Sequence, residues 1–272
     1  MLGVLLWGAM LYNTHAQLAQ ARNGTTYQAS RDTPSVLLVG DVALPLSARI
    51  EALALGRDES TLLVALGSGV LLTLADVPDS ISSLSLAAPQ TLGSFGSASD
   101  ALRPLPRDGP ASYARFVGLS DARYNSAAVG WVWAAVDRGR LRVFADGEVQ
   151  TVLPDVTNAV SVAVAGWHMA VVCAGGSLTL VGSTRVVVRL SGVVDAELVL
   201  NSDGAPVVYY LADGMLWRNT AEPITRATGA TALRRTGDEL LAISGGAQVK
   251  FHGLCSSLDR LRVGYRLAHE CA

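Results

Sequence analysis

A short pattern recurs along most of this chain: a turn that ends in glycine, followed by a short apolar segment. Self-similarity at a regular period is the sequence signature of repeat architectures. Because glycine supplies the positive φ that tight hairpins need, each copy predicts a hairpin turn leading into a β-strand. The copies are GSGVLLTLA from Gly67, DRGRLRVFA from Asp137, AGGSLTLVG from Ala174, ADGMLWRN from Ala212 and SGGAQVKFHG from Ser244.

The spacing of these strands predicts the number of repeats. With SVLLVG at Ser35 as a further strand of the same kind, equivalent positions lie 36, 69, 37, 38 and 33 residues apart. The second step is close to twice the others, so one degenerate copy is expected between about Ser80 and Pro110, which gives seven units. The equivalent positions are Leu38, Leu74, Val143, Leu180, Arg218 and Phe251.

Each unit has the same internal order. A strand such as ARIEALALG comes first, a second strand such as STLLVALG follows, and the glycine turn then leads to the third. Units of this size bury their faces only by stacking, and closure into a ring protects the sheet edges. The sequence therefore predicts an all-β fold, a β-propeller of about seven blades over residues 35–253, with a C-terminal closing segment at residues 254–272.

The stretch from Asn158 to Ser183 allows a second interpretation. It contains 26 residues without Asp, Glu, Lys or Arg, which is long enough for a transmembrane helix. However, VSVAVA from Val160 alternates valine with serine or alanine, and a Gly-Gly pair at Gly175 follows. This alternation favours a β-hairpin that is in register with the other units.

The unit AVSVAVAGWHMAVVCAGGSLTLVGS, Ala159 to Ser183, resembles a repeat of the regulator of chromosome condensation family. In that family a small-Gly-x-x-His segment leads into an apolar strand, a glycine turn and a strand ending in Gly. Here His168 follows Gly166 with one residue between them, and the other units share the layout more loosely. The resemblance implies a seven-bladed propeller. Family members range from a nuclear nucleotide-exchange factor to secreted inhibitors that cap an enzyme, and exchange activity is not implied here.

Residues 1–21 are predicted to form a targeting segment, followed by a linker over residues 22–34. LGVLLWGAMLY, from Leu2 to Tyr12, is an uncharged apolar run of signal-peptide length, and Ala16 and Ala21 fit two cleavage sites. An uncleaved segment would act as a membrane anchor. The first acidic residue of the chain is Asp32, and an N-terminal segment without acidic residues also suits a mitochondrial presequence. We therefore expect a secreted or membrane-anchored, extracytoplasmic protein, with a mitochondrial location as the alternative.

Covalent features are predicted near both ends of the chain. Asn23-Gly24-Thr25 is a glycosylation sequon if the chain is exported. Cys255 and Cys271 bracket the C-terminal segment, where a disulfide would pin a terminal strand; two free thiols are the alternative. Cys173 lies in the apolar run MAVVCAGG and is predicted to be buried. Without a C-x-x-C pair, no structural zinc site is indicated.

The chain shows no catalytic signature. Its formal net charge is −2 and no Lys/Arg cluster stands out, so nucleic acid is not an expected partner. No H-E-x-x-H, G-x-S-x-G, P-loop or EF-hand spacing is present, so no catalytic residue, metal or cofactor is predicted. Asp203-Gly204 and Asp213-Gly214 fit hairpin turns better than a carboxylate pair.

Four residues are candidates for partner binding: Trp131, Trp133, Trp167 and His168. Trp131 and Trp133 are two positions apart, so within a strand they would point to the same side and form an anchor pair if that side were exposed. Trp167 and His168 could face a pocket at the mouth of the ring. The alternative for His168 is a turn histidine bonded to a backbone carbonyl.

These observations favour a non-enzymatic interaction protein whose loops on one face of the ring bind another protein. One alternative is an accessory structural subunit of a larger membrane complex, including a mitochondrial one, with residues 1–21 retained as a helix. Another is a hydrolase or lyase acting on a glycan or lactone in the central channel. That activity would need acidic or histidine side chains converging on the axis.

Overall fold

The computed structural model confirms the all-β prediction: in the described part of the chain, all regular secondary structure is β-strand. It also contains no helix that is long and apolar enough to cross a membrane in that part. The described residues are 18–21, 25–30, 32–40, 42–56, 59, 61–67, 70–75, 90–91, 106–111, 113–219, 222–236, 239–244 and 247–251.

The described strands form six antiparallel sheets, numbered here in chain order. Sheet 1 contains β1 (Leu18–Gln20), β2 (Thr26–Ala29), β3 (Val36–Val39) and β4 (Val42–Pro45). Sheet 2 contains β5 (Ile50–Leu55), β6 (Thr61–Leu66), β7 (Leu71–Ala75) and β8 (Gln90–Thr91). Sheet 3 contains β10 (Leu119–Tyr124), β11 (Trp133–Asp137), β12 (Arg140–Ala145), β13 (Glu148–Val152) and, at its edge, β9 (Gly109–Pro110).

The remaining three sheets follow the same order. Sheet 4 contains β14 (Ala159–Ala165), β15 (His168–Cys173), β16 (Leu178–Val181) and β17 (Arg185–Arg189). Sheet 5 contains β18 (Val193–Leu200), β19 (Pro206–Ala212), β20 (Met215–Arg218) and β21 (Glu222–Arg226). Sheet 6 contains β22 (Ala232–Thr236), β23 (Glu239–Ser244) and β24 (Ala247–Phe251).

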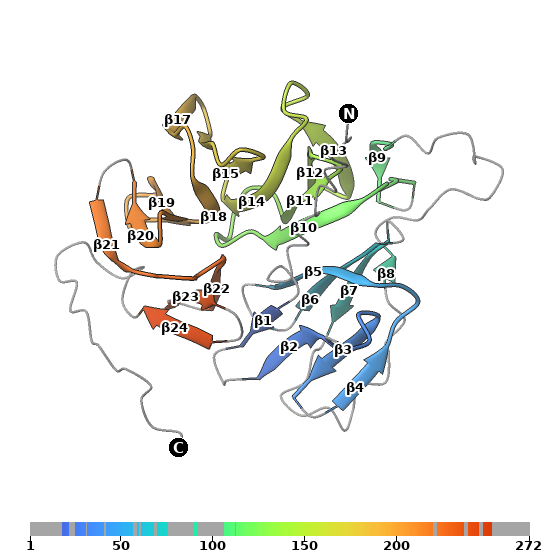
Figure 1. Ribbon diagram of the computed structural model, residues 1–272. Coiled ribbons are helices and arrows are strands. Elements are labelled where there is room, and N and C mark those ends of the chain that lie inside the picture. Colours follow the sequence, from blue (N-terminus) through green and yellow to red (C-terminus); the bar gives the residue numbers. More distant parts are fainter. Residues whose placement is uncertain are drawn as a thin grey trace, which may run out of the picture.

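The sheets are arranged around a common centre (Figure 1). The first strands of sheets 2 to 6, β5, β10, β14, β18 and β22, contact one another in that order and line the centre. Each interface between consecutive sheets holds one cluster of buried apolar side chains. Among the described residues no such cluster joins sheet 6 to sheet 1. Stacking of sheets, rather than a core within any one of them, therefore stabilises the molecule.

The repeat seen in the sequence corresponds to the third strand of each sheet. All six equivalent positions lie in third strands, namely β3, β7, β12, β16, β20 and β24. The turn glycines have the expected conformation, as at Gly139 (φ 77°) before β12, where a Cβ would lie 2.3 Å from the carbonyl oxygen of Thr157. The predicted order of two strands, a glycine turn and a third strand is confirmed in sheets 3, 4 and 5.

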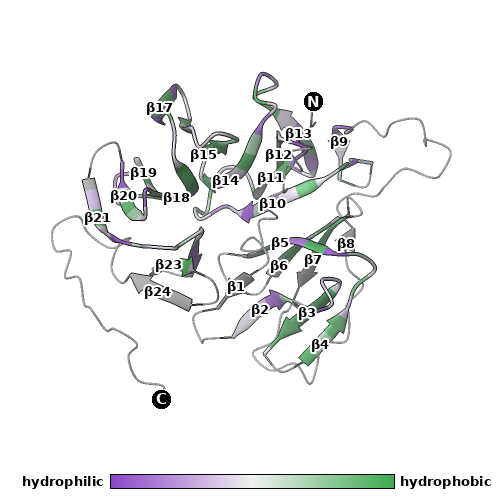
Figure 2. Ribbon diagram, in the orientation of Figure 1, coloured by the Kyte–Doolittle hydropathy of each residue, from purple (hydrophilic) through white to green (hydrophobic). Residues whose placement is uncertain are grey.

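The uncharged stretch over residues 158–183 forms strands β14, β15 and β16, so the β-hairpin interpretation is confirmed. Figure 2 shows this region as largely hydrophobic. Six of the seven residues of β14 are buried, because sheets 3 and 5 cover both of its faces. A strand covered on both faces has no solvent side to carry charges, which explains a composition that resembles a membrane helix.

Two strands of sheet 1 lie in the part of the chain that is predicted to be a targeting segment and a linker. Strands β1 and β2 lie within the segments assigned to targeting (1–21) and to a linker (22–34), yet both pair into sheet 1. Ala19 and Ala21 are each only 5% exposed, and Tyr27 is 2% exposed. The short segments LAQ and TYQA carry no apolar run, and they form strands because β2 pairs with β3 and β1 pairs with β2.

The seventh expected unit is not among the described sheets. Its residues fall mainly in 76–89 and 92–105, outside the described part of the chain, as does the closing segment 254–272. From that stretch, β8 joins sheet 2 and β9 joins sheet 3.

The same irregularity in strand pairing recurs in the first strands of four sheets, which line the centre of the molecule. In β5, β10, β14 and β18 the pairing with the second strand shifts by one residue just after the strand begins. Such bulges re-aim the side chains that follow them. The residues directly after the shift are structurally equivalent: Ala52, Asp121, Ser161 and Asp195.

Candidate binding face

The loop between β10 and β11, residues 125–132, is held in shape by the buried side chain of Asn125. Its Nδ2 donates hydrogen bonds to the carbonyl oxygens of Val129 (2.7 Å) and Trp131 (2.5 Å). Its Oδ1 accepts hydrogen bonds from the backbone N–H groups of Ala127 and Gly166, both at 2.8 Å. One amide therefore fixes the loop of sheet 3 and ties it to the β14–β15 turn of sheet 4.

The same two loops pack backbone against backbone. Gly130 has a φ of 98°, and a Cβ there would lie 2.0 Å from the carbonyl oxygen of Gly166. The Trp131 N–H donates to that oxygen at 3.3 Å. This close approach brings Trp131 and Trp167 into an edge-to-face pair, with ring centroids 5.5 Å apart and an interplanar angle of 76°. Such pairs stabilise by about 0.5–1.5 kcal/mol beyond the area they bury.

Large apolar side chains remain exposed around this junction. Trp167 is 56% exposed, Val129 64% and Val132 45%, whereas Trp131 is half-buried. We call Val129, Trp131, Val132 and Trp167 the apolar rim. Exposed aromatic residues on a rigid support are the residue type that dominates binding energy at protein interfaces.

The four candidate binding residues differ in how far they are exposed. Trp133, at 1% exposure, stacks on Phe144 inside the molecule, so Trp131 and Trp133 do not form an exposed anchor pair. Trp133 begins β11, whose five residues are all buried, whereas Trp131 lies in the preceding loop. His168 is partly buried with its ring against Gly182, and its buried Nδ1 has no hydrogen-bond partner. Binding through Trp131, Trp167 or His168 stays a prediction.

Of the residues considered for covalent chemistry, only Cys173 lies in the described part of the chain. Asn23, Cys255 and Cys271 lie outside the described residues. Cys173 is a buried free thiol at the end of β15, as its apolar surroundings predicted.

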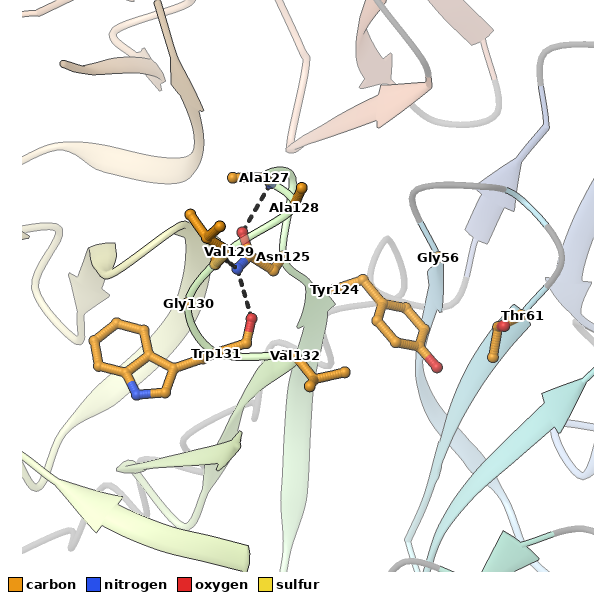
Figure 3. Close-up of a pocket in the computed structure, with 10 residues that line it drawn as sticks. All are labelled: Gly56, Thr61, Tyr124, Asn125, Ala127, Ala128, Val129, Gly130, Trp131 and Val132. Atoms are coloured by element: carbon orange, nitrogen blue, oxygen red, sulfur yellow. Dashed lines mark hydrogen bonds between the residues drawn. The ribbon is translucent and has the colours of Figure 1, made fainter. Parts of the chain in front are cut away.

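A pocket of about 540 Å³ lies beside the apolar rim, between sheets 2 and 3. Figure 3 shows the Tyr124 ring pointing across it toward Thr61, while the Trp131 side chain points away on the other side of the loop. The lining residues are Gly56, Thr61, Tyr124, Asn125, Ala127, Ala128, Val129, Gly130, Trp131 and Val132.

The same loop also reaches over the centre of the molecule through Ser126. The Ser126 hydroxyl donates to the carbonyl oxygen of Leu198 in sheet 5 (3.0 Å), and the Ser126 backbone N–H donates to the carbonyl oxygen of Val164 in sheet 4 (3.1 Å). The Arg235 guanidinium of sheet 6 donates to the Ser126 carbonyl oxygen at 3.2 Å. A single residue thus links four sheets and stabilises the face that carries the apolar rim.

Beneath Ser126 lies a buried cluster of charged side chains centred on Arg123 of β10. Its guanidinium donates to Asp121 (3.3 Å), to Asp195 and Glu197 of β18 (3.2 Å each), and to the carbonyl oxygen of Leu233 in β22 (3.1 Å). Sheet 3 is not a neighbour of sheet 5 or sheet 6 in the chain order, so this side chain connects sheets across the centre. We call these groups, together with Ser161 and Arg234, the axial cluster.

Asp195 is the second hub of the axial cluster. It accepts hydrogen bonds from Arg234 (2.8 Å), from the Ser161 hydroxyl (2.6 Å) and from the backbone N–H of Leu233 (2.9 Å), in addition to those from Arg123. Asp121 similarly accepts from the Val162 N–H at 3.1 Å. The two aspartates therefore satisfy backbone donors of neighbouring sheets, which is the condition for burying a carboxylate.

Burial and charge act in opposition in this cluster. Burial raises the pKa of Asp195, but Arg123 and Arg234 outweigh that effect and hold the pKa below its ordinary value. For Glu197 burial prevails, and the pKa is raised despite the nearby Arg123. The difference has a structural cause, since Asp195 receives two guanidinium groups and Glu197 one.

Sequence reasoning missed the axial cluster, although a signal was present. Asp121-Ala122-Arg123 and Asp195-Ala196-Glu197 place ionisable residues two positions apart in first strands. Alternate residues of a strand share a face, so each pair had to enter the interior together. The structural equivalence of Asp121 and Asp195 makes the two triplets copies of one repeat position.

The axial cluster is also the feature that a channel hydrolase would need. Acidic side chains do converge on the axis, but Asp121, Asp195 and Glu197 are 0%, 2% and 6% exposed and each is bonded to an arginine. Within the described residues no group of histidine, cysteine and acidic side chains could hold a metal ion.

The loop junction makes a first prediction. Gly130→Ala is expected to lower the free energy of unfolding by about 1–3 kcal/mol, because the new Cβ would collide with the Gly166 backbone in addition to the strain of its positive φ. Urea titration followed by tryptophan fluorescence measures this. Gly175→Ala is the matched control, since Gly175 has a similar φ of 94° with no atom within 4 Å of a Cβ. Equal losses in the two variants would show that the junction is not tightly packed.

No protein-family model matches this chain, and no curated protein sequence matches it, so the resemblance to regulator of chromosome condensation repeats stays a prediction. Among solved structures, the fold is similar to that in the crystal structure of BBS1N in complex with ARL6DN, soaked with mercury. The TM-score is 0.51 at 14% sequence identity, covering 83% of this chain and 73% of that chain. Because BBS1N is a β-propeller, this likeness supports a propeller-type arrangement of the six sheets.

Proposed function

We propose that this chain is a non-enzymatic protein-interaction β-propeller that binds a partner protein through the apolar rim. The observation that carries the proposal is the exposure of Trp167, Val129 and Val132 on loops whose backbone is fixed by Asn125. An aromatic side chain on a preorganised loop binds with little further loss of conformational entropy. BBS1N, which shares the fold, was crystallised in complex with ARL6DN, so a domain of this shape can bind another protein.

Burial of the axial cluster supports the non-enzymatic part of the proposal. A carboxylate that acts as a general acid or base must reach the substrate directly or through one water molecule. Asp121, Asp195 and Glu197 instead use their oxygens on arginine and backbone donors. Their arrangement fits a role in connecting sheets.

The position of β1 in sheet 1 limits where the signal peptide of an exported chain could be cleaved. Cleavage after Ala21 would remove β1 together with the buried Ala19, whereas cleavage after Ala16 would leave sheet 1 complete. We therefore propose Gln17 as the first residue of an exported form. Retention of residues 1–21 would instead support the alternative of an accessory subunit in a membrane complex.

The experiment compares Trp167→Glu with the wild type in affinity purification of the tagged full-length chain from its native host in mild detergent. A charge at Trp167 is expected to reduce recovery of the direct partner by about thirtyfold, because loss of an interface hot spot costs about 2 kcal/mol or more. Quantitative mass spectrometry measures the recovery and also reads the N-terminal peptide.

Val187→Glu provides the matched control, because Val187 lies on the outer strand β17 and is 53% exposed. This variant introduces the same charge at a distance from the apolar rim and should recover the partner fully. The proposal is wrong if Trp167→Glu recovers the same stoichiometric partner as the wild type, or if both variants lose it equally.

A further inference from the structure

The pocket beside the apolar rim is suited to one group of a larger ligand. Its volume of about 540 Å³ lies within the range of ligand-binding pockets, roughly 300–1,000 Å³. One wall comes from Gly56, which directly follows β5, and Thr61, which begins β6; the other comes from the end of β10 and the loop that follows it. The second wall is fixed by the Asn125 amide, so the pocket exists before any ligand binds.

The chemistry of the walls restricts what can bind. Among the described residues, none of the ten that line the pocket is Asp, Glu, Lys, Arg or His. The Asn125 amide already forms hydrogen bonds with the backbone of Val129, Trp131, Ala127 and Gly166. It therefore has little remaining capacity to hydrogen-bond a ligand. A charged group placed here would lose its hydration without gaining an opposite charge, which is strongly unfavourable. The pocket therefore fits an uncharged, apolar group.

The pocket adjoins the apolar rim: Val129, Trp131 and Val132 belong to both, with the Trp131 side chain pointing away from the pocket toward Trp167. A small molecule that filled the pocket would leave Trp167 exposed on the far side of Trp131. A polypeptide can insert one side chain into the pocket and cover Trp167 with its neighbouring residues. The two features together favour a peptide segment over a free small molecule.

We propose that the pocket between sheets 2 and 3 receives a large uncharged side chain, aromatic or aliphatic, from the partner polypeptide that covers the apolar rim. This inference rests on the proposed function and adds the identity of the anchor. Burial of such a side chain removes about 150–250 Å² of surface from water when it is aromatic, which makes it the energetic centre of the interface.

Selection from a library of random peptides displayed on phage, with the folded full-length chain immobilised, tests the proposal. Selected peptides are expected to share Trp, Phe, Leu or Ile at one fixed position, with no requirement for charge there. A synthetic copy of the strongest peptide is then titrated against the variants. Ala128→Phe, which fills the pocket mouth from an exposed lining residue, should weaken binding about thirtyfold, the loss expected for a hot spot.

The matched control is Ala205→Phe, an exposed alanine in the β18–β19 loop outside the pocket lining, which should bind the peptide as the wild type does. A charged consensus, or equal binding by Ala128→Phe and the wild type, overturns the inference. If Trp167→Glu still abolishes binding in that case, the proposed function survives; if neither variant affects it, both fail. Equally tight, Ala128→Phe-sensitive binding of N-acetyl-tryptophanamide alone would reassign the pocket to small molecules.

Discussion

Replacing Arg123 with methionine is expected to lower the free energy of unfolding by about 3–5 kcal/mol, because removing one partner of a buried ion pair leaves the other charges uncompensated. Methionine has a similar length but offers no donor to Asp121, Asp195 or Glu197. A loss of this size is comparable with the whole stability of a typical domain, about 5–15 kcal/mol. Urea titration followed by circular dichroism measures it.

Two further variants keep this prediction testable. Arg140→Met removes an exposed arginine of β12 and should leave the unfolding midpoint nearly unchanged. Arg123→Lys keeps the charge but cannot reach sheets 3, 5 and 6 at once, so its stability should fall between wild type and Arg123→Met. If all three arginine variants unfold at the wild-type midpoint, the axial cluster does not connect the sheets.

The second large effect concerns two acidic residues of β18 that lie two positions apart. Asp195→Asn is expected to cost about 3–5 kcal/mol, because it removes the negative charge facing two buried guanidinium groups. Glu197→Gln should cost little at neutral pH or even stabilise the fold, since burial raises the pKa of Glu197 despite the single facing guanidinium of Arg123. Comparable losses in both variants would contradict this distinction.

The pKa directions also fix how stability changes with pH. Because the folded pKa of Glu197 is raised by burial, stability increases as the pH falls through that pKa toward the ordinary value of 4.5. Because the folded pKa of Asp195 is lowered, its contribution is complete above the ordinary value of 3.8 and is lost as the pH falls through the folded pKa.

The wild-type chain should therefore be most stable at mildly acidic pH. Denaturant titrations across the pH range test this expectation. Glu197→Gln should reduce the rise in stability between neutral and mildly acidic pH, and Asp195→Asn should weaken the fall at lower pH. A wild-type profile that declines steadily from neutral pH would show that Arg123 compensates Glu197 fully.

The axial cluster and the apolar rim are mechanically related. Ser126, near the start of the β10–β11 loop and three residues after Arg123, bonds to sheets 4, 5 and 6. Four sheets must therefore keep their relative positions for the loop to present Trp131 and Val129. Variants of the cluster that still fold should weaken partner binding without touching the rim.

The repeat pattern by itself determined the strand order and the position of the turns. Glycine at Gly139 and the apolar run of β16 are local requirements of a tight hairpin and a buried strand, so they are visible in short windows of sequence. The same logic identified the uncharged stretch after Asn158 as strands.

What only the tertiary structure decided depends on residues far apart in the chain. Arg123 meets Glu197 at a separation of 74 residues, and Trp131 meets Trp167 because two glycines allow their loops to touch. The burial of Trp133 and the pairing of β1 with β2 likewise follow from neighbours that local sequence does not reveal. Strand period and turn chemistry are local properties, whereas burial and charge compensation arise only when the sheets stack around one centre.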